Sequence, residues 1–368
     1  MNANKTNITR RSFLKLSAAG LGGLVMIPHV QLLPKIDFPQ YERLGRAFNK
    51  IEIKLKPDIN AQTTKVIYDD TVVPWLREVV GFHPYRFRQR WVETPDGYIW
   101  ASDLQPVKNL PNKPLTTLPQ TSLGPGMWAE VTIPWVDVIL ENQPISPGFK
   151  SKVEAGYPIR LYYSQVLWVD QIKTNESGIT LYRIKEKYGY GDIMWANAEA
   201  FRPITEEEVA PINPQTENKI VVINVEEKYQ TLSCFEGNSE VYFCRISAGK
   251  KYDPDGTYLG ESATPKGTLN IWRKQISTHM SGGTTGAGYD LPGIGWTTLF
   301  SGDGVAIHST FWHNTFGGEL MSHGCVNAAP DDAKWVFRWT NPPVPYDPGD
   351  LYSKDVEIPP TKVQVKEG

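Results

Sequence analysis

The sequence has little of three things that decide what kind of protein a chain can be: cysteine, net charge and long apolar segments. Its 368 residues include 3 cysteines, an odd number too small for a disulfide framework. The net charge of −2 excludes nucleic acid as a main partner, because phosphate binding needs a basic surplus. With 40% hydrophobic and 21% charged residues, the composition excludes both a disordered chain and a multi-span membrane protein.

Turn-forming and aromatic residues are plentiful instead. The 31 glycines and 29 prolines follow no period, and 12 Trp and 17 Tyr accompany them. This profile is typical of many short strands and turns, so we expect a mainly β fold. At roughly 150 residues per domain, the length predicts two or three domains.

The first 33 residues resemble a twin-arginine export signal. Arg10 and Arg11 stand in the run TRRSFLK, and the apolar stretch 16–27 follows. A helix of that length covers ~18 Å, less than the ~30 Å hydrocarbon core, so we expect no permanent membrane span. The resemblance implies export to the periplasm or cell wall, with membrane contact only through this signal. A basic amphipathic helix is the alternative. With no small-x-small site before Gln31, an uncleaved N-terminal anchor also stays open, whereas the lack of a nearby cysteine excludes a lipoprotein.

Two strand-rich modules follow, at residues 50–108 and 127–211. Both contain an aromatic strand end followed by an apolar, proline-containing exit, at 100–107 in the first module and 195–204 in the second. The modules resemble small bacterial SH3-like β-barrels; barrels of another kind that act as spacers are the alternative. Four prolines make 109–126 an extended, semi-rigid linker.

Two of the three cysteines fall in one expected hairpin, with strands at 229–235 and 240–246. Centring its turn on Gly237-Asn238 places Cys234 opposite Val241 and Cys244 opposite Thr231. The two cysteines would then be ~10 Å apart along the strands, beyond the ~7 Å Cα limit of a disulfide. We expect two packed, unpaired thiols, with a disulfide as the less favoured alternative.

The third cysteine, Cys325, follows a glycine at the apex of an expected turn, after a strand that leads to His308. A thiol nucleophile needs a base, oriented backbone N–H groups and partial exposure. His308 can be the base. Gly324 lacks a Cβ and lets two N–H groups face one carbonyl oxygen. The helix expected from Pro330 places a positive dipole end near the sulfur, which favours the thiolate.

These residues carry a family resemblance. The run IHS around His308 and the run SHGCVN at 322–327 resemble the YkuD-type L,D-transpeptidase catalytic domain. The segment ATPKGTLNI at 263–271 fits the same pattern, which extends over residues 217–368. The resemblance implies a β-sandwich-like catalytic domain with a short helix after the cysteine. It also implies transfer of peptidoglycan stem peptides through an acyl-cysteine, without cofactor or metal.

The resemblance also assigns roles to single residues. Cys325 would be the nucleophile and His308 the general base, with Gly324 and Cys325 supplying oxyanion N–H groups. His323 and Ser322 would position or polarise the pair. The residues assigned to substrate binding are Ser309, Tyr289 and Asn327. Many family members have Arg where Asn327 stands, which puts a substrate salt bridge from that position in doubt. The segment 341–360 reads as an insertion that either covers the cleft or packs on the surface.

Several alternatives stay open. A zinc site would use Cys325 with His308, His313 and His323, but their spacing lacks the usual ligand pairs. His313 is otherwise structural or substrate-lining, and His279 a strand or loop histidine that could line the cleft.

The expected partners are stem peptides, as acyl donor and amine acceptor, and carbapenem-type β-lactams as inhibitors. A carboxypeptidase or endopeptidase on the same acyl-enzyme, or a non-catalytic wall-binding protein, are the alternative functions. Because every assigned residue lies beyond 217, we expect residues 1–216 to be dispensable for acylation.

Overall fold

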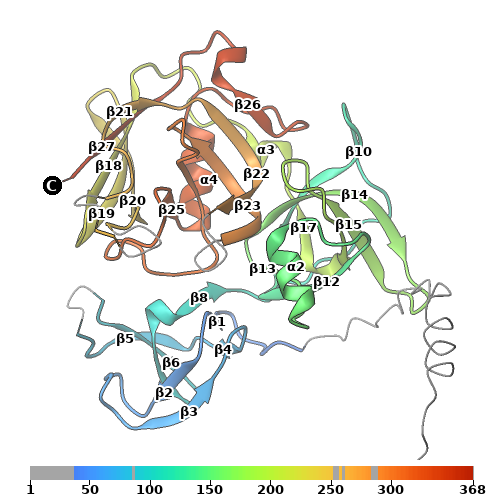
Figure 1. Ribbon diagram of the computed structural model, residues 1–368, viewed down its shortest axis with the longest axis vertical. Helices are drawn as coiled ribbons and strands as arrows, with labels where there is room; N and C mark the ends of the chain where they lie inside the picture. Colours follow the sequence, from blue (N-terminus) through green and yellow to red (C-terminus); the bar gives the residue numbers. More distant parts are fainter. Residues whose placement is uncertain (1–36, 85–87, 252–256, 259–261, 283–288, 368) are drawn as a thin grey trace, which may run out of the picture. The chain divides into compact units, whose positions relative to one another are not determined.

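The computed structural model describes residues 37–367 except 85–87, 252–256, 259–261 and 283–288. The expected export signal at 1–33 lies outside the described residues. Strands dominate, so the mainly β prediction is confirmed, and the described helices are short (Figure 1). None of the helices in the described part of the chain is long and apolar enough to cross a membrane.

Residues 44–107 form two small antiparallel sheets, which we call the first module. One sheet has the order β4 (Val72–Pro74), β1 (Leu44–Ala47), β8 (Leu104–Val107). The other has the order β3 (Thr63–Ile67), β2 (Ile51–Lys54), β7 (Gly97–Trp100), β6 (Arg90–Thr94), β5 (Arg77–Val80). Alternating inward side chains such as Ile53, Val92 and Ile99 fill its core.

Residues 127–203 form one seven-stranded sheet, the second module. Its order is β13 (Arg160–Tyr162), β12 (Trp135–Leu140), β16 (Ile193–Asn197), β15 (Thr180–Lys185), β14 (Val166–Thr174), β11 (Met127–Val131), β17 (Phe201–Pro203). Helix α2 (Pro147–Glu154) begins where the Ser146 hydroxyl accepts the Phe149 N–H, a side-chain N-cap. The expected linker at 109–126, before the second module, contains a short strand pair, β9 (Gln120–Thr121) with β10 (Gly124–Pro125). The likeness to SH3 barrels stays a prediction.

Beyond α3 (Glu206–Val209), a ten-stranded sheet makes up the C-terminal part. Its order is β21 (Gly267–Asn270), β27 (Lys362–Lys366), β18 (Lys219–Glu226), β19 (Tyr229–Glu236), β20 (Ser239–Ser247), β25 (Val326–Ala328), β24 (Ala306–Ser309), β23 (Tyr289–Leu299), β22 (Arg273–Gly282), β26 (Asp350–Tyr352). Figure 1 shows helix α4 (Pro330–Trp339) inside the curve of this sheet. Pro330 starts α4, and its buried face carries Ala333, Val336 and Phe337, as the sequence predicts.

The cysteine hairpin forms, but in a different register. Cys234 faces Tyr242 and Cys244 faces Leu232, and the pairing shifts at a bulge next to Cys234. The predicted partners Val241 and Thr231 are therefore wrong, because the extra residue of the bulge moves every later pair by one position. Both cysteines are buried and unpaired, which confirms the prediction of packed thiols.

The C-terminal sheet and the second module share one hydrophobic core. Trp128, Val166 and Trp168 of the second module belong to the same buried cluster as α4 and β18. The Trp128 indole N–H also donates to the Tyr346 carbonyl at 2.8 Å. The segment 341–360 thus packs against the second module, while its strand β26 pairs with β22 at the sheet edge. This shared core argues against the expectation that residues 1–216 are dispensable for acylation, which stays a prediction.

Candidate active site

The parallel pair β24–β25 brings the two predicted catalytic residues together. Its register pairs His308 with Asn327 and Ile307 with Val326, and Cys325 directly precedes β25. The Ala306 N–H donates toward the Cys325 sulfur. In this register Cys325 comes opposite Ala306, and His308, two residues further along β24, points to the same face as these two residues. Two adjacent strands thereby place the thiol and the imidazole on the same face of the β24–β25 pair.

The Cys325 thiol is half-buried and neutral. Its sulfur lies 3.8 Å from the Gly304 carbonyl oxygen. Burial raises the pKa of Cys325 to about 11, although the Ala306 N–H opposes this shift. Burial therefore opposes the thiolate that we expected from the dipole of α4, and strand β25 lies between Cys325 and the first turn of that helix in the sequence.

His308 is also neutral, and its proton can be placed. Its side chain is buried, and Nδ1 lies 2.9 Å from the Ser309 carbonyl oxygen. Because a carbonyl only accepts, Nδ1 carries the proton and Nε2 keeps a free lone pair. Burial lowers the pKa of His308 to about 4, although the bond to Ser309 opposes this shift. The Trp312 ring stacks on the imidazole at 5.7 Å between centroids, which fixes its plane.

The turn before Cys325 is held by two hydroxyls. Ser322 Oγ accepts the Gly324 N–H at 3.1 Å and donates to the Cys325 carbonyl oxygen. Thr264 Oγ1 donates to the Gly324 carbonyl oxygen at 2.8 Å. Gly324 has φ of +144°, a conformation that other residues rarely adopt. The Gly324 N–H that we expected in the oxyanion hole is thus engaged by Ser322, and Ser322 acts by shaping the turn.

His323 and Tyr289 form one wall beside the sulfur. The exposed His323 ring stacks on Tyr289 with centroids 5.4 Å apart. Burial raises the pKa of Tyr289, and the charge of an ionised Cys325 raises it further. The predicted substrate residue Tyr289 and the predicted positioning residue His323 therefore meet at the site.

The other two predicted substrate residues lie below the surface. Asn327 is 1% exposed, and its amide lies 2.7 Å from His313 Nε2. Ser309 is 2% exposed, and its hydroxyl accepts the Gly295 N–H at 3.1 Å. Both side chains therefore support the strands that carry His308 and Cys325 instead of lining an open cleft. His313 belongs to this support, and burial lowers its pKa to about 3.

Two arginines of the first module hold the loop that follows His308, and sequence reasoning missed both. Arg46 donates to the Phe311 carbonyl oxygen at 2.7 Å, and Arg88 donates to the Thr315 carbonyl oxygen. Each contact joins residues more than 200 positions apart. The one signal in the sequence is that Arg46 falls within an otherwise apolar strand.

A metal centre finds no support among the described residues. They contain no group of three or more His, Cys, Asp or Glu side chains that could hold an ion. Of the four residues of the zinc alternative, His308 contacts Ser309 and His313 contacts Asn327, while His323 stacks on Tyr289.

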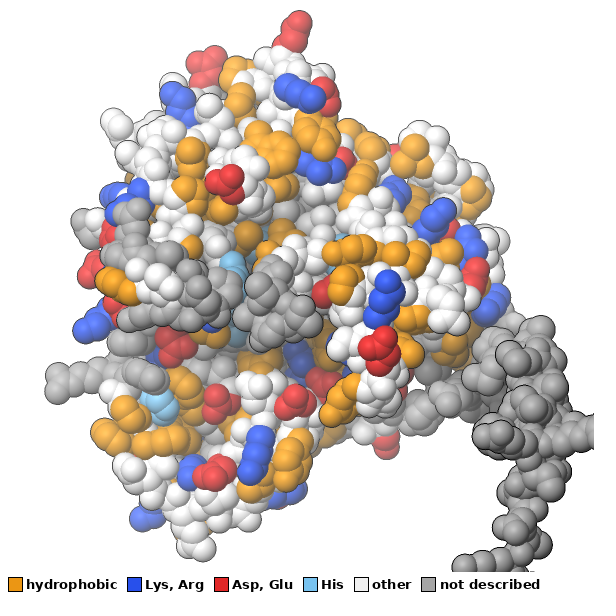
Figure 2. All heavy atoms as spheres, viewed as in Figure 1, with side chains coloured by type: hydrophobic (Ala, Val, Ile, Leu, Met, Phe, Trp, Pro, Cys, Tyr) orange, Lys and Arg blue, Asp and Glu red, His pale blue; other side chains and the backbone are white. Residues whose placement is uncertain are grey.

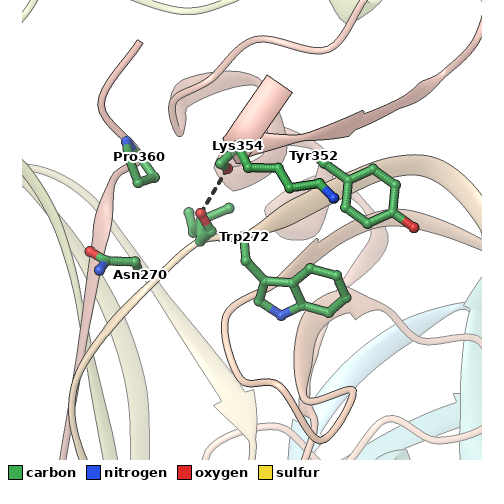
Figure 3. Close-up of a pocket in the computed structure, with 7 residues that line it drawn as sticks. Asn270, Trp272, Tyr352, Lys354 and Pro360 are labelled. Atoms are coloured by element: carbon green, nitrogen blue, oxygen red, sulfur yellow. Dashed lines mark hydrogen bonds between the residues drawn. The ribbon is translucent and has the colours of Figure 1, made fainter. Parts of the chain in front are cut away.

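A cavity of about 490 Å³ lies away from these residues, along the edge where β26 pairs with β22. Figure 3 shows Trp272 and Tyr352 on one side of it, with Asn270 and Pro360 across from them. The Ser353 hydroxyl donates to the Ile271 carbonyl oxygen at 2.8 Å at its base. None of the residues predicted for catalysis or substrate binding lines this cavity.

Charges of both signs are interspersed on the face seen in Figure 2, with no single-sign patch. This distribution agrees with the small net charge. A polyanion therefore has no continuous basic track on this face.

Comparison with known proteins identifies the C-terminal part. A family model described as YkuD, the L,D-transpeptidase catalytic domain, matches residues 218–365. L,D-transpeptidase 2 of Mycobacterium tuberculosis is 25% identical over 116 residues, 29% of this chain and 28% of that protein. L,D-transpeptidase 1 of the same species is 33% identical over 81 residues, 20% of this chain and 32% of that protein. The chain thus spans less than a third of the length of these relatives.

Solved structures of related proteins match with low overall superposition. The catalytic domain from an E. faecium L,D-transpeptidase acylated by ertapenem is 24% identical, with a TM-score of 0.28. The match covers 40% of this chain and 96% of that one. A crystal structure of an L,D-transpeptidase from M. tuberculosis H37Rv is 16% identical, with a TM-score of 0.29, and covers 70% and 98%.

Proposed function

Residues 218–365 belong to the YkuD family of L,D-transpeptidase catalytic domains, and from this we propose that the protein is an exported cell-wall transpeptidase. Its donor substrate is a peptidoglycan stem tetrapeptide, and its acceptor is an amine on another stem. The reaction passes through an acyl-enzyme on Cys325 and uses no cofactor. The observation that carries the proposal is the half-buried Cys325 thiol on the same face of the β24–β25 pair as His308, whose Nε2 is free to accept a proton.

The protonation states decide how the first step runs. Cys325 has a pKa of about 11 and His308 a pKa of about 4, so a neutral pair is the resting state at neutral pH. The sulfur attacks the donor carbonyl while its proton passes to His308 Nε2. The C–N bond to the terminal residue then breaks, His308 returns the proton to the leaving amine, and a thioester remains.

The second step reverses these roles. The acceptor amine attacks the thioester carbonyl and gives its proton to His308. The C–S bond breaks, and the departing sulfur takes the proton back as the new amide is released. In both steps the Cys325 N–H is our candidate donor to the oxyanion, because Ser322 engages the Gly324 N–H. Water in place of the amine would make the same site a hydrolase.

Acylation by a carbapenem tests the nucleophile. The E. faecium relative carries ertapenem as an acyl group, and we propose the same chemistry for Cys325. Mass spectrometry of the protein incubated with ertapenem should find one adduct of the full drug mass on the peptide 322–327. Cys325→Ala should give none, and Cys234→Ala should react as the parent does. An adduct on Cys234 or Cys244 would move the active site elsewhere.

The product of the natural substrate separates transferase from hydrolase. Purified disaccharide-tetrapeptide should yield a cross-linked dimer with one free D-alanine per bond formed. Free D-alanine without dimer would identify a carboxypeptidase on the same acyl-enzyme. Binding of the tetrapeptide without turnover would instead favour a wall-binding protein.

Export depends on the paired arginines in our proposal. Replacing Arg10 and Arg11 together by lysine should leave the full-length precursor in the cytoplasm. Unchanged export of that double variant would exclude the twin-arginine route. The proposal also keeps the two N-terminal modules as SH3-like domains, whose ligand is a separate question from the chemistry at Cys325.

A further inference from the structure

A buried histidine joins the second module to the strand that carries Tyr289. His279 of β22 lies between two carboxylates, with Nδ1 at 2.9 Å from both oxygens of Glu186 and Nε2 against Asp290 Oδ1. Glu186 directly follows β15 of the second module, whereas Asp290 lies on β23 of the C-terminal sheet. The three side chains are 1%, 4% and 10% exposed. We call them the acid–histidine–acid clamp.

Close packing surrounds the clamp. The Gly148 N–H of α2 donates to the second Asp290 oxygen at 2.6 Å. A Cβ at Gly148 would approach Asp290 Cβ to 2.7 Å, so the fit leaves no room for a larger residue. The Tyr190 ring meets His279 edge-on at 5.1 Å, and its hydroxyl lies 2.7 Å from Ser281 Oγ. The second module therefore packs closely against the β22–β23 pair around His279 and Asp290.

The clamp lies next to Tyr289, which stacks on His323. Asp290 and Tyr289 are neighbours on β23, so their side chains point to opposite faces of the strand. Asp290 faces the clamp, while Tyr289 stacks on His323 beside Cys325. A shift of Asp290 therefore moves the backbone that carries Tyr289.

The contacts also define the charge of His279. A carboxylate only accepts, so both ring nitrogens must donate, and the imidazole is protonated. Burial works against this charge, but hydrogen bonds to Glu186 and Asp290 outweigh burial and raise the pKa of His279 above its usual range. Other titratable groups nearby are Tyr190, Lys152, Lys187 and Tyr188; burial lowers the pKa of Lys152, although Asp290 pulls it upward, and burial lowers the pKa of Lys187 to about 8.

We propose that His279 is a positioning residue for the reaction at Cys325. Its charged ring ties Asp290 to Glu186 and thereby holds Tyr289 in its stack on His323, two residues before Cys325. The assignment deepens the proposed function and rests on it for the reaction, but the link between the clamp and the sulfur does not depend on that function. When the pH rises through the raised pKa of His279, the ring loses a proton and one of its two bonds. Tyr289 is then released.

The ratio of the acylation rate of the parent protein to that of His279→Gln isolates this effect. Titration of Cys325 and His308 changes both rates by the same factor and so cancels in the ratio. We expect the parent to acylate with imipenem faster by up to ~10²-fold at neutral pH, the range known for ångström-scale misplacement. The ratio should fall towards one at alkaline pH, with a midpoint equal to the His279 pKa measured by NMR of the ring nitrogens. Glu186→Gln removes one charge from the clamp and should move both midpoints to lower pH together.

Matched variants separate positioning from stability. Asp170→Asn removes a carboxylate that binds Arg183 elsewhere in the second module, and it should leave the profile unchanged. Gly148→Ala pushes on Asp290 without changing charge, so it should slow acylation without moving the midpoint. If Glu186→Gln lowers the melting temperature but leaves the rate midpoint in place, His279 is merely structural and the proposal fails.

Alkylation of Cys325 by iodoacetamide keeps the test independent of transpeptidation. If the Tyr289–His323 stack limits access to the neighbouring Cys325 in the clamped state, alkylation of His279→Gln should exceed that of the parent below the His279 midpoint and match it above. A protein that ignores imipenem yet shows this alkylation profile would refute the proposed function and uphold the clamp. Equal alkylation rates for both proteins at every pH would overturn the clamp.

Discussion

At the scale of single residues, the chemistry depends on two groups that burial keeps uncharged. The sulfur of Cys325 has a backbone N–H and a carbonyl as neighbours, and the imidazole of His308 has one carbonyl. Neither group has a counter-ion among the contacts described above. Charge therefore appears at the site when an electrophile arrives and the thiol proton moves to His308.

This arrangement predicts the acid side of the pH profile. Below the His308 pKa of about 4, the ring is protonated and cannot accept the thiol proton. The rate of acylation by ertapenem should therefore rise as the pH passes about 4 and then level off. A single-turnover rate profile by mass spectrometry checks this outcome. A rise centred instead near pH 8–9, where an ordinary thiol ionises, would mean that a free thiolate attacks without His308.

Gly324 supplies a second residue-scale prediction. Its φ of +144° disfavours any side chain, and an added Cβ would lie 3.3 Å from both the Ala263 oxygen and a Val305 methyl group. Gly324→Ala should lower the free energy of unfolding by about 1–3 kcal/mol and slow acylation by misplacing Cys325. Gly302→Ala is the matched control, since nothing lies within 4 Å of its added Cβ. Urea unfolding of both variants measures the difference; equal stability would contradict the strain at Gly324.

At the scale of elements, the cysteine hairpin makes a direct prediction. Cys234 and Cys244 are 0% and 5% exposed, and burial raises the pKa of both thiols. Iodoacetamide at neutral pH should label the native protein once, at Cys325, and all three thiols after unfolding in guanidinium. Peptide mapping gives the sites. Early labelling of Cys234 would show that the β19–β20 hairpin opens in the native state.

The same hairpin shows how far element-scale prediction reaches. Alternation of apolar and polar residues located its two strands, but a bulge displaced the partners of Cys234 by one position. Helix α4 was equally clear from Pro330 and its apolar spacing. The burial that raises the pKa of Cys325 was not, because it depends on contacts across the sheet. The motif located the thiol and imidazole, whereas burial of Ser309 and Asn327 depends on contacts across the sheet.

At the scale of the whole described chain, the active-site strands are supported from both modules. Arg46 connects Asp70 to the Phe311 carbonyl oxygen in the loop after His308. The clamp around His279 connects Glu186 of the second module to Asp290 on β23. The Arg46–Phe311 and His279–Glu186 contacts join residues 265 and 93 positions apart, and no local sequence pattern predicts them. Sequence reasoning therefore divided the chain into separable modules where the folded protein has a common core.

Truncation tests that common core. Removing residues 1–216 would strip Trp128, Val166, Trp168, Ile204 and Val209 from the cluster beneath α4. At ~1.5–3 kcal/mol for each buried side chain, the loss is about 10 kcal/mol, comparable to the whole stability of a typical domain. We expect fragment 217–368 to be unfolded or aggregated by circular dichroism and light scattering. A chain beginning at Asp37 keeps all five residues and should match the full chain in melting temperature and in ertapenem acylation. A folded, acylating 217–368 fragment would instead mean that α4 and the sheet hold their core without the second module.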